Sequence, residues 1–301
     1  MIQLNKRFAD KNEMKRFVMD CERKYDEQVR LAARKICSNR EERFIMLSGA
    51  SCSGKTTTSF ILEDEMKKFG KTAKIISIDD FYRSRNDIQS DKIPDYEAAS
   101  ALDLDYFVIC ICDILAGKHT RLPKYDFQLG RRSEYTDYIP NENEFIVFEG
   151  IQAMYPEIIS LLPKKATRSV YIGIHDDVTA YGSIFTARDI RLMRRIVRDY
   201  FFRGASVSLT MNLWGGVTKN EDENIFPNSR FADFYINTLM LYEINVMKPY
   251  ILNEKMYDLS VASEAEVYNK FKEKFQNVQP IPAELIPENS VFREFIGNKP
   301  I

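Results

Sequence analysis

The stretch that decides the fold is "FIMLSGASCSGKTTTSFILEDEMKKFG", residues 44–70. It begins with an apolar run typical of a buried strand, turns at two glycines, and continues as an amphipathic helix that ends at Gly70. Within it, "GASCSGKT" from Gly49 to Thr56 fits the pattern G-x-x-x-x-G-K-[ST]. This pattern also arises by chance, but a strand before it and a helix after it are the context that its chemistry requires. We therefore expect a phosphate-binding loop.

The residue types of this loop suit a nucleoside triphosphate. Backbone N–H groups of such a loop converge on phosphate oxygens, and the following helix adds the positive end of its dipole. We expect Lys55 to reach the β- and γ-phosphates and Thr56 to ligate Mg²⁺. The residues expected to contact the nucleotide are Gly49, Ala50, Ser51, Cys52, Ser53, Gly54, Lys55, Thr56 and Thr57. The flanking elements disfavour the alternative, a glycine-rich turn that carries a surface lysine.

Acidic residues end two later apolar strands. "IISIDDFYR" places Asp79 and Asp80 after one strand, and "FIVFEG" places Glu149 at the end of another. Parallel strands end at one edge of a sheet, where ligands of open α/β sheets bind. One acid of the first pair can take a proton from a substrate hydroxyl or hold the waters of a metal; alternatively, both only cap the next segment. The predicted Mg²⁺ ligands are Thr56, Glu149 and Asp79.

Arginines cluster in "ARDIRLMRRIVRDYFFRG", residues 187–204. On a helical wheel, five of them fall within about one third of the circumference, opposite an apolar face: Arg188, Arg191, Arg194, Arg195 and Arg198. Such a stripe is usually a solvated basic face. Clustered guanidinium groups also offset the negative charge of a phosphoryl-transfer transition state, so beside a triphosphate site we favour a phosphate-facing lid at about 186–204. A nucleic-acid groove is disfavoured because no aromatic residues are interleaved.

Composition indicates an ordinary globular enzyme. The 301 residues carry a net charge of -1, which gives no overall attraction to nucleic acid or to a membrane. No apolar run reaches the roughly 20 residues that span a bilayer, and the first residues are too charged for a secretory signal. The five cysteines form no CxxC pair, which favours reduced thiols over disulfides or zinc. We expect a cytoplasmic protein without nucleic-acid or membrane partners.

The motifs taken in order resemble a known family. "GASCSGKTT", "SIDDFYR", "LPKYDFQLGRR", "VFEGI", "DIRLMRRIVRD" and "RFAD" together are similar to the uridine kinase and phosphoribulokinase family of P-loop kinases, over roughly residues 44–250. The sequence is most similar to the bacterial uridine kinase-like branch, which has a tail similar to "IPENSVFREFIG". The resemblance implies an ATP- and Mg²⁺-dependent kinase of a small nucleoside-like or sugar substrate. Relatives are often dimers or tetramers, so it also implies a homo-oligomer.

The resemblance also implies roles for single residues. Asp79 corresponds to the general base that acts on a nucleoside 5′-hydroxyl, and Glu97 to an acid that binds ribose hydroxyls. The implied catalytic set is Asp79, Lys55, Arg191 and Arg195, and Arg194 joins the residues on the triphosphate. The implied substrate-binding set is Tyr82, Glu97, Tyr125, Phe127 and Arg132, with the two aromatic residues of the hairpin beside the base.

The residues that read the base depart from the family's uridine-cytidine kinases. Where those enzymes have a histidine that contacts the pyrimidine, this sequence has Gly130, and where they have R-G-R-D it reads "RGAS" with Ala205. A later polar residue is replaced by Leu213 or Trp214. A site without such donors cannot strongly reject analogues. A kinase of another sugar or small alcohol, and a nucleotide-binding regulatory protein with little kinase activity, therefore stay open, as does the choice between ATP and GTP.

The expected architecture is an α/β fold. Strands that alternate with helices favour a P-loop NTPase, nucleoside-kinase-like, with a doubly wound parallel sheet, a helical lid, an inserted β-hairpin and an added N-terminal helix. We expect a helical extension over 1–42, the kinase domain over 43–260 with its hairpin at about 119–138, and a C-terminal helix and tail over 261–301 that packs on the core. The proline-rich residues 279–287 are expected to lie on the surface.

Overall fold

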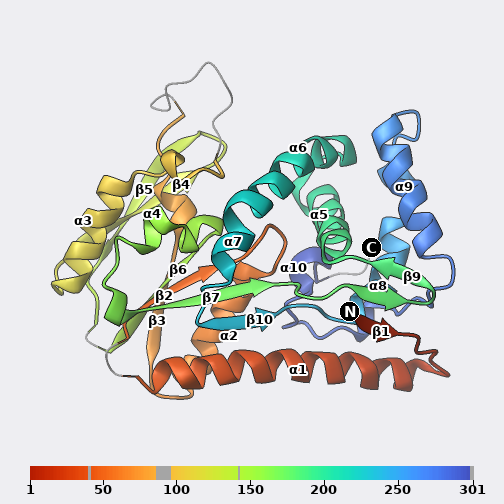
Figure 1. Cartoon of the computed structure of the whole chain (residues 1–301), viewed down its shortest axis with the longest axis horizontal. Coiled ribbons are helices and arrows are strands. Elements are labelled where there is room, and N and C mark those ends of the chain that lie inside the picture. The colour runs from red at the N-terminus through yellow and green to blue at the C-terminus, as the bar shows by residue number, and fades with distance from the viewer. Residues whose placement is uncertain (40–41, 86–95, 142, 299–301) are drawn as a thin grey trace.

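The computed structural model describes residues 1–39, 42–85, 96–141 and 143–298. At its centre lies a parallel sheet of five strands in the order β10-β7-β2-β6-β3 (Figure 1). The strands are β2 (Phe44–Ser48), β3 (Thr72–Ser77), β6 (Glu144–Glu149), β7 (Thr167–Gly173) and β10 (Phe234–Asn237). All five residues of β2 are buried, as expected for the central strand of a sheet that is covered on both faces. The predicted doubly wound α/β fold is confirmed.

Alternate residues of the central strand enter two separate cores. Ile45 and Leu47 pack in one core with helices α1 (Lys11–Cys37), α2 (Lys55–Lys67) and α8 (Glu243–Ile251). Phe44 and Met46 pack in the other with α3 (Leu104–Leu115) and α4 (Pro156–Ile159). This alternation follows from the two-residue period of a strand and places helices on both faces of the sheet.

The N-terminal helix lies along one face of the sheet, as Figure 1 shows. The side chain of Asp10 caps it by accepting a hydrogen bond from the N–H of Glu13. The helix docks on the core through an apolar stripe that is buried at Val18, Cys21, Tyr25, Val29, Ala32, Ala33 and Ile36. A small sheet escaped prediction: β1 (Ile2–Leu4) pairs with β8 (Val178–Ala180), which pairs with β9 (Ser183–Phe185).

The predicted hairpin is formed by β4 (Thr120–Asp126) and β5 (Arg131–Tyr138), which pair antiparallel with an irregularity at Lys124 and Tyr125. It stands beside α3 at the edge of the molecule where the central strands β3 and β6 end (Figure 1). The hairpin therefore reaches the edge of the sheet at which ligands of open α/β folds bind.

The later half of the chain is mainly helical: α5 (Ala187–Arg203), α6 (Val207–Asn220), α7 (Phe226–Ser229), α9 (Ala262–Lys274) and α10 (Arg293–Ile296). Thr186 and Asp189 form a capping box at the start of α5, and Gly204 ends it in the left-handed conformation with φ 67°. The expectation of a surface tail is wrong for Ile281 and Ile286, which are buried. Among the described residues, no helix is both long enough and apolar enough to cross a bilayer.

Candidate active site

The phosphate loop joins β2 to α2 and needs its two glycines. A Cβ at Gly49 would lie 2.1 Å from the carbonyl oxygen of Ile172, and Gly54 caps α2 with φ 86°. Lys55 folds back over the loop, and its Nζ donates to the carbonyl oxygens of Gly49 at 2.8 Å and Ala50 at 3.1 Å. The ammonium group thus lies over the loop.

Three successive carbonyl groups of the loop accept hydrogen bonds from side chains outside the loop. Arg191 Nη1 donates to Ser51 O at 3.3 Å, Arg194 Nη1 to Cys52 O at 3.2 Å, and Thr238 Oγ1 to Ser53 O at 2.7 Å. A trans peptide directs its N–H opposite to its C=O, and no described peptide bond is cis. The N–H groups of Cys52 and Gly54 therefore point away from these donors, which is the orientation that an anion cradle requires.

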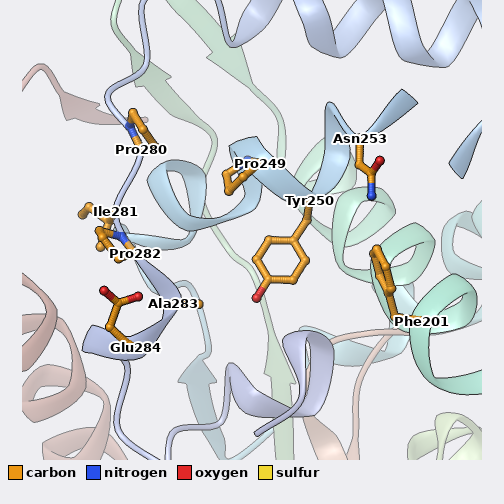
Figure 2. A pocket seen from close by; sticks show the side chains of 9 residues that line it. All are labelled: Phe201, Pro249, Tyr250, Asn253, Pro280, Ile281, Pro282, Ala283 and Glu284. Carbon is orange, nitrogen blue, oxygen red and sulfur yellow. The ribbon is translucent and has the colours of Figure 1, made fainter. Parts of the chain in front are cut away.

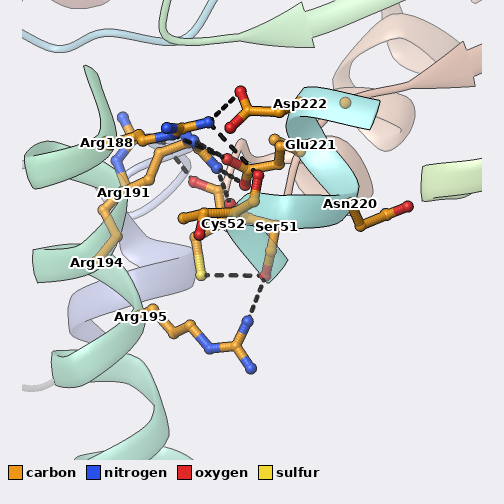
Figure 3. A network of polar contacts seen from close by, with 12 residues as sticks. Ser51, Cys52, Arg188, Arg191, Arg194, Arg195, Asn220, Glu221 and Asp222 are labelled. Carbon is orange, nitrogen blue, oxygen red and sulfur yellow. Dashed lines mark hydrogen bonds and ion pairs between the residues drawn. The ribbon is translucent and has the colours of Figure 1, made fainter. Parts of the chain in front are cut away.

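Arg191 and Arg194 of α5 are buried and hydrogen-bonded rather than solvated, and Figure 3 shows the polar contacts around them. Arg191 is 2% exposed and pairs with Glu221, with Nη2 2.7 Å from Oε2. Arg194 is fully buried, and its Nε and Nη2 lie 2.6 and 2.8 Å from the carboxylate of Glu243. The remaining N–H groups of Arg194 donate to Thr238 and to the loop, so all five of its donors are used within the protein.

Arg195 has a different environment from its two neighbours. Its Nη1 donates to Ser51 Oγ at 3.2 Å, and its Nε lies 3.3 Å from Asp199 Oδ2. The side chain keeps 13% of its surface exposed, beside the loop. The indole of Trp214 on α6 lies near both guanidinium groups, 5.7 Å from Arg191 and 6.0 Å from Arg195. Arg195 is therefore the arginine of this helix best placed to meet a bound phosphate.

The two aspartates after β3 serve different parts of the molecule. Asp79 Oδ1 is buried and has no hydrogen-bond partner, and burial, together with the charge of Glu149, raises the pKa of Asp79 to about 6 against the opposing effect of Lys55. Asp80 accepts hydrogen bonds from the N–H of Tyr125 at 3.1 Å and from Lys124 Nζ at 3.2 Å. Asp80 anchors the hairpin, whereas Asp79 Oδ1 keeps no hydrogen-bond partner.

The residues predicted to bind Mg²⁺ fit a hydrated ion. The strand register pairs Ser77 with Glu149, so Glu149 ends β6 next to the strand that precedes Asp79. Thr56 is exposed in the first turn of α2. The part of the chain that the structure describes has no group of three or more His, Cys, Asp or Glu that could enclose a metal. Since Mg²⁺ commonly takes one or two carboxylates, waters and substrate phosphates, the partnerless oxygen of Asp79 suits this mode of binding.

Aromatic side chains gather at the turn end of the hairpin, where β4 ends and β5 begins. Tyr82 lies 5.6 Å from Tyr125 and 5.0 Å from Tyr96 between ring centroids, and Tyr125 lies 5.1 Å from Phe127. The hydroxyl of Tyr82 donates to the carbonyl oxygen of Tyr96 at 2.6 Å. The structure therefore brings together three of the predicted substrate-binding residues, and it adds Tyr96.

Polar side chains that the sequence analysis missed border this cluster. Asn220 Nδ2 lies 2.5 Å from Glu97 Oε2, and Tyr155 OH donates to Asn220 Oδ1 at 3.0 Å. The buried Gln152 donates from Nε2 to Tyr96 O at 2.7 Å. Gln152 comes three residues after the acid that ends β6, so its place just past a strand end could have signalled it. No pattern in the sequence marks Asn220.

Arg132 of the hairpin lies differently from expectation, and Gly130 has a close neighbour that the sequence does not reveal. Arg132 Nη2 pairs with Asp103 Oδ2 at 2.7 Å, at the start of α3, rather than with the aromatic cluster. Gly130 has φ 66°, and a Cβ there would lie 2.6 Å from Arg85 Cδ. Arg85 donates to Phe127 O at 2.9 Å and to Tyr96 OH at 3.1 Å. An arginine from another segment therefore fills the space beside Gly130.

Two hollows flank the phosphate loop. One, of about 320 Å³, is lined in part by Thr56, Asp80 and Glu149; the other, of about 370 Å³, in part by Ala50 and Arg191. A third hollow, of about 350 Å³, lies elsewhere, between Phe201, Tyr250 and the segment Pro280–Glu284 (Figure 2). No residue of the loop or of the strand ends lines this third hollow, whereas residues of the predicted site line the first two.

Known proteins are similar to this chain. Residues 44–245 match the sequence profile of the Phosphoribulokinase / Uridine kinase family. The uridine kinase of Limosilactobacillus reuteri (strain DSM 20016) is 28% identical over 204 residues, 67% of this chain and 85% of that protein. The uridine kinase of Staphylococcus aureus (strain JH9) is 29% identical over 197 residues, 64% of this chain and 86% of that protein. Among solved structures, D-glycerate 3-kinase from Cryptococcus neoformans var. grubii serotype A has a TM-score of 0.45 and 15% identity, and the match covers 72% of this chain and 89% of that one.

The family profile covers the phosphate loop, both acid-bearing strand ends, the hairpin and the arginine helix, which are the motifs that carried the resemblance. It extends over more than half of the 301 residues. The resemblance inferred from the sequence is confirmed: this chain belongs to the phosphoribulokinase / uridine kinase family of P-loop kinases.

Proposed function

We propose that the protein moves the γ-phosphate of ATP to a hydroxyl group of a nucleoside-like acceptor, with Asp79 as general base. The observation that carries this proposal is the carboxylate of Asp79, which has a buried oxygen without a partner and lies within the electrostatic reach of Lys55 in the phosphate loop. A pKa raised to about 6 leaves it ionised at neutral pH and basic enough to take a proton.

The proposed transfer is a single in-line displacement. The proton of the acceptor hydroxyl moves to Asp79 as the acceptor oxygen forms a bond to the γ-phosphorus. The bond between that phosphorus and the β–γ bridging oxygen breaks, and its electron pair leaves with ADP. The loop and the strand ends hold the two reactants in one orientation, which lowers the entropic part of the barrier.

Positive charge for the transition state is assigned to side chains around the loop. Lys55 lies over the loop, and Arg195 reaches Ser51 Oγ. Thr56, with Glu149 or Asp79, would hold Mg²⁺, which when bound supplies positive charge to the phosphate oxygens. We assign Arg191 and Arg194 to the support of the loop, because buried carboxylates pair with both and both donate to loop carbonyls.

The variant Asp79→Asn tests the assignment of the base. It should abolish phosphoryl transfer, while MgATP still binds with a dissociation constant within a few-fold of the parent value. Isothermal titration calorimetry measures the binding, and release of ADP measures the transfer. Turnover at the parent rate would refute the assignment, and loss of nucleotide binding would show that Asp79 belongs to the donor site.

A kinase of another sugar or small alcohol is the second candidate. Two observations favour it. The polar pair of Glu97 and Asn220 suits the hydroxyl groups of a sugar, whereas Gly130 offers no side chain to a nucleobase. A panel of nucleosides, free sugars and small polyols, assayed for ADP release, discriminates between the candidates. Turnover confined to nucleosides supports the first, and turnover confined to sugars or polyols supports the second. ATP binding without turnover of any acceptor points instead to a nucleotide-binding regulatory protein.

A further inference from the structure

A C-terminal segment beyond the family match packs against the phosphate loop. Its apolar side chains Val291, Phe292, Phe295 and Ile296 are all fully buried. Arg293 stiffens the segment by donating to the carbonyl oxygens of Ala283, Ile286, Pro287 and Gly297. α10, which belongs to this segment, lies next to α5 (Figure 1). The segment Pro287–Gly297 is therefore a fixed part of the core rather than a loose tail.

This segment touches both the loop and the first turn of α2. A Cβ at Gly54 would lie 2.9 Å from Val291 Cγ2, so the valine side chain covers this glycine. Thr57 Oγ1 donates to Glu294 Oε2 at 2.7 Å. The next hydroxyl in the turn, Thr58 Oγ1, lies 2.8 Å from the hydroxyl of Tyr25 on α1. Elements from both ends of the chain thus fix the turn that follows the loop.

The same segment supports an arginine of the loop. The ring of Phe295 lies 4.5 Å from Cζ of Arg194, whose Nη1 holds the carbonyl of Cys52. Both side chains are fully buried, where a contact between a cation and an aromatic face is strongest. The segment therefore contacts the loop directly through Val291 and indirectly through Arg194.

We propose that the segment Pro287–Gly297 positions the phosphate loop for the donor nucleotide, with Glu294 acting as a positioning residue through Thr57. Thr57 belongs to the set expected to contact the nucleotide, and its hydroxyl can take many orientations unless a partner selects one. A carboxylate near the N-terminus of α2 is also favoured by the helix dipole. The proposal concerns the donor site and does not depend on the identity of the acceptor.

The test is a double-mutant cycle on MgATP binding without acceptor, measured by calorimetry on the full chain. Glu294→Ala should raise the dissociation constant at least about 10-fold, the effect of losing a hydrogen bond to a charged group. Glu294→Gln keeps an acceptor oxygen and should stay within about threefold of the parent. In a Thr57→Val background, Glu294→Ala should have no further effect, because its contribution passes through the hydroxyl.

Glu284→Ala is the matched control. Glu284 belongs to the neighbouring tail and pairs with Lys11 at 3.3 Å on the surface, so its loss should leave nucleotide binding unchanged. Melting temperatures of all variants separate a change of binding from a loss of folded protein. Unchanged or tighter binding in Glu294→Ala would overturn the proposal, and so would an equal loss in the parent and Thr57→Val backgrounds. This test measures only the binding of MgATP. If no acceptor were phosphorylated in the transfer assay, the proposed function would fail, but the result for Glu294 would still stand.

Discussion

Asp79 and Asp80 are adjacent in the chain, yet one carboxylate has a buried oxygen without a partner while the other is hydrogen-bonded to the hairpin. The short 3-10 turn Ile78–Phe81 that contains them directs the two side chains differently. The carboxylate of Asp79 lies close enough to Glu149 and Lys55 for both charges to shift its pKa. In the proposed mechanism, proton transfer and the placement of the hairpin are thus divided between neighbouring residues, and substitutions can separate them.

Asp80→Asn should impair acceptor binding and spare the donor site. The amide can still accept from the N–H of Tyr125, but it loses the ion pair with Lys124, so the hairpin that carries Tyr125 and Phe127 loosens. We expect the KM for the acceptor to rise about 3- to 10-fold, consistent with roughly 1 kcal/mol for such a contact, and the KM for ATP to stay unchanged. Initial-rate kinetics with each substrate varied in turn measures both. A larger effect on ATP than on the acceptor would contradict this division of roles.

The rate should depend on pH through Asp79. Burial and the charge of Glu149 raise its pKa to about 6, so below that pH the base is protonated and kcat/KM for the acceptor should fall about tenfold per pH unit. Glu149→Gln removes one cause of the raised pKa and should move the inflection to lower pH, whatever its effect on the maximal rate. Because ATP itself titrates in this range, its dissociation constant is measured across the same pH values. An inflection in ATP binding alone would contradict the prediction.

The same carboxylate should make the folded state less stable as the pH rises. The folded pKa of about 6 lies above the ordinary value of 3.8, so the folded protein holds its proton to higher pH than the unfolded chain does. Stability is therefore lost as the pH rises from about 4 to about 6, by up to roughly 3 kcal/mol. Asp79→Asn should be more stable than the parent at pH 7.5 and equally stable near pH 3.5. Urea unfolding at both pH values measures the difference in unfolding free energy between Asp79→Asn and the parent. If the variant were more stable by the same amount at both pH values, the titration of Asp79 could not be the cause.

Sequence patterns predicted the backbone of the site better than its side-chain contacts. The loop, the acids at the strand ends and the hairpin follow from the periodicity of apolar residues and from positions that only glycine can occupy. Gly49 is such a position, because a side chain there would clash with the backbone of Ile172. The partners of Arg191 and Arg194 are not local: Glu221 and Glu243 come 30 and 49 residues later in the chain. A helical wheel shows that arginines share a face, but it cannot show which buried acids will meet them.

Arg195 should matter more for the transfer step than for binding. It lies beside the loop at Ser51 Oγ, and its contact with Asp199 is looser than the paired contacts of Arg191 and Arg194. Arg195→Ala should lower kcat at least about 100-fold with a small change in the dissociation constant of ATP, because the charge it offsets develops in the transition state. The control is Arg203→Ala, at the exposed end of the same helix and 3.8 Å from Asp199. Equal losses in both variants would indicate damage to α5 instead.

Gly130 should resist substitution because of Arg85. Gly130 and Gly117 share φ 66°, but a Cβ at Gly130 would lie 2.6 Å from Arg85 Cδ, whereas a Cβ at Gly117 meets nothing within 4 Å. Gly117→Ala therefore measures the cost of the left-handed backbone alone, about 1 kcal/mol, and Gly130→Ala should cost more. The excess should disappear when Arg85→Ala is combined with Gly130→Ala, since the clash is then removed. Gly130→His should likewise fail to create a contact with a pyrimidine, because Arg85 occupies the space beside this position and donates to Tyr96 and Phe127. Uridine turnover, measured for Gly130→His with and without Arg85→Ala, checks this expectation. A gain of uridine turnover in Gly130→His alone would contradict it.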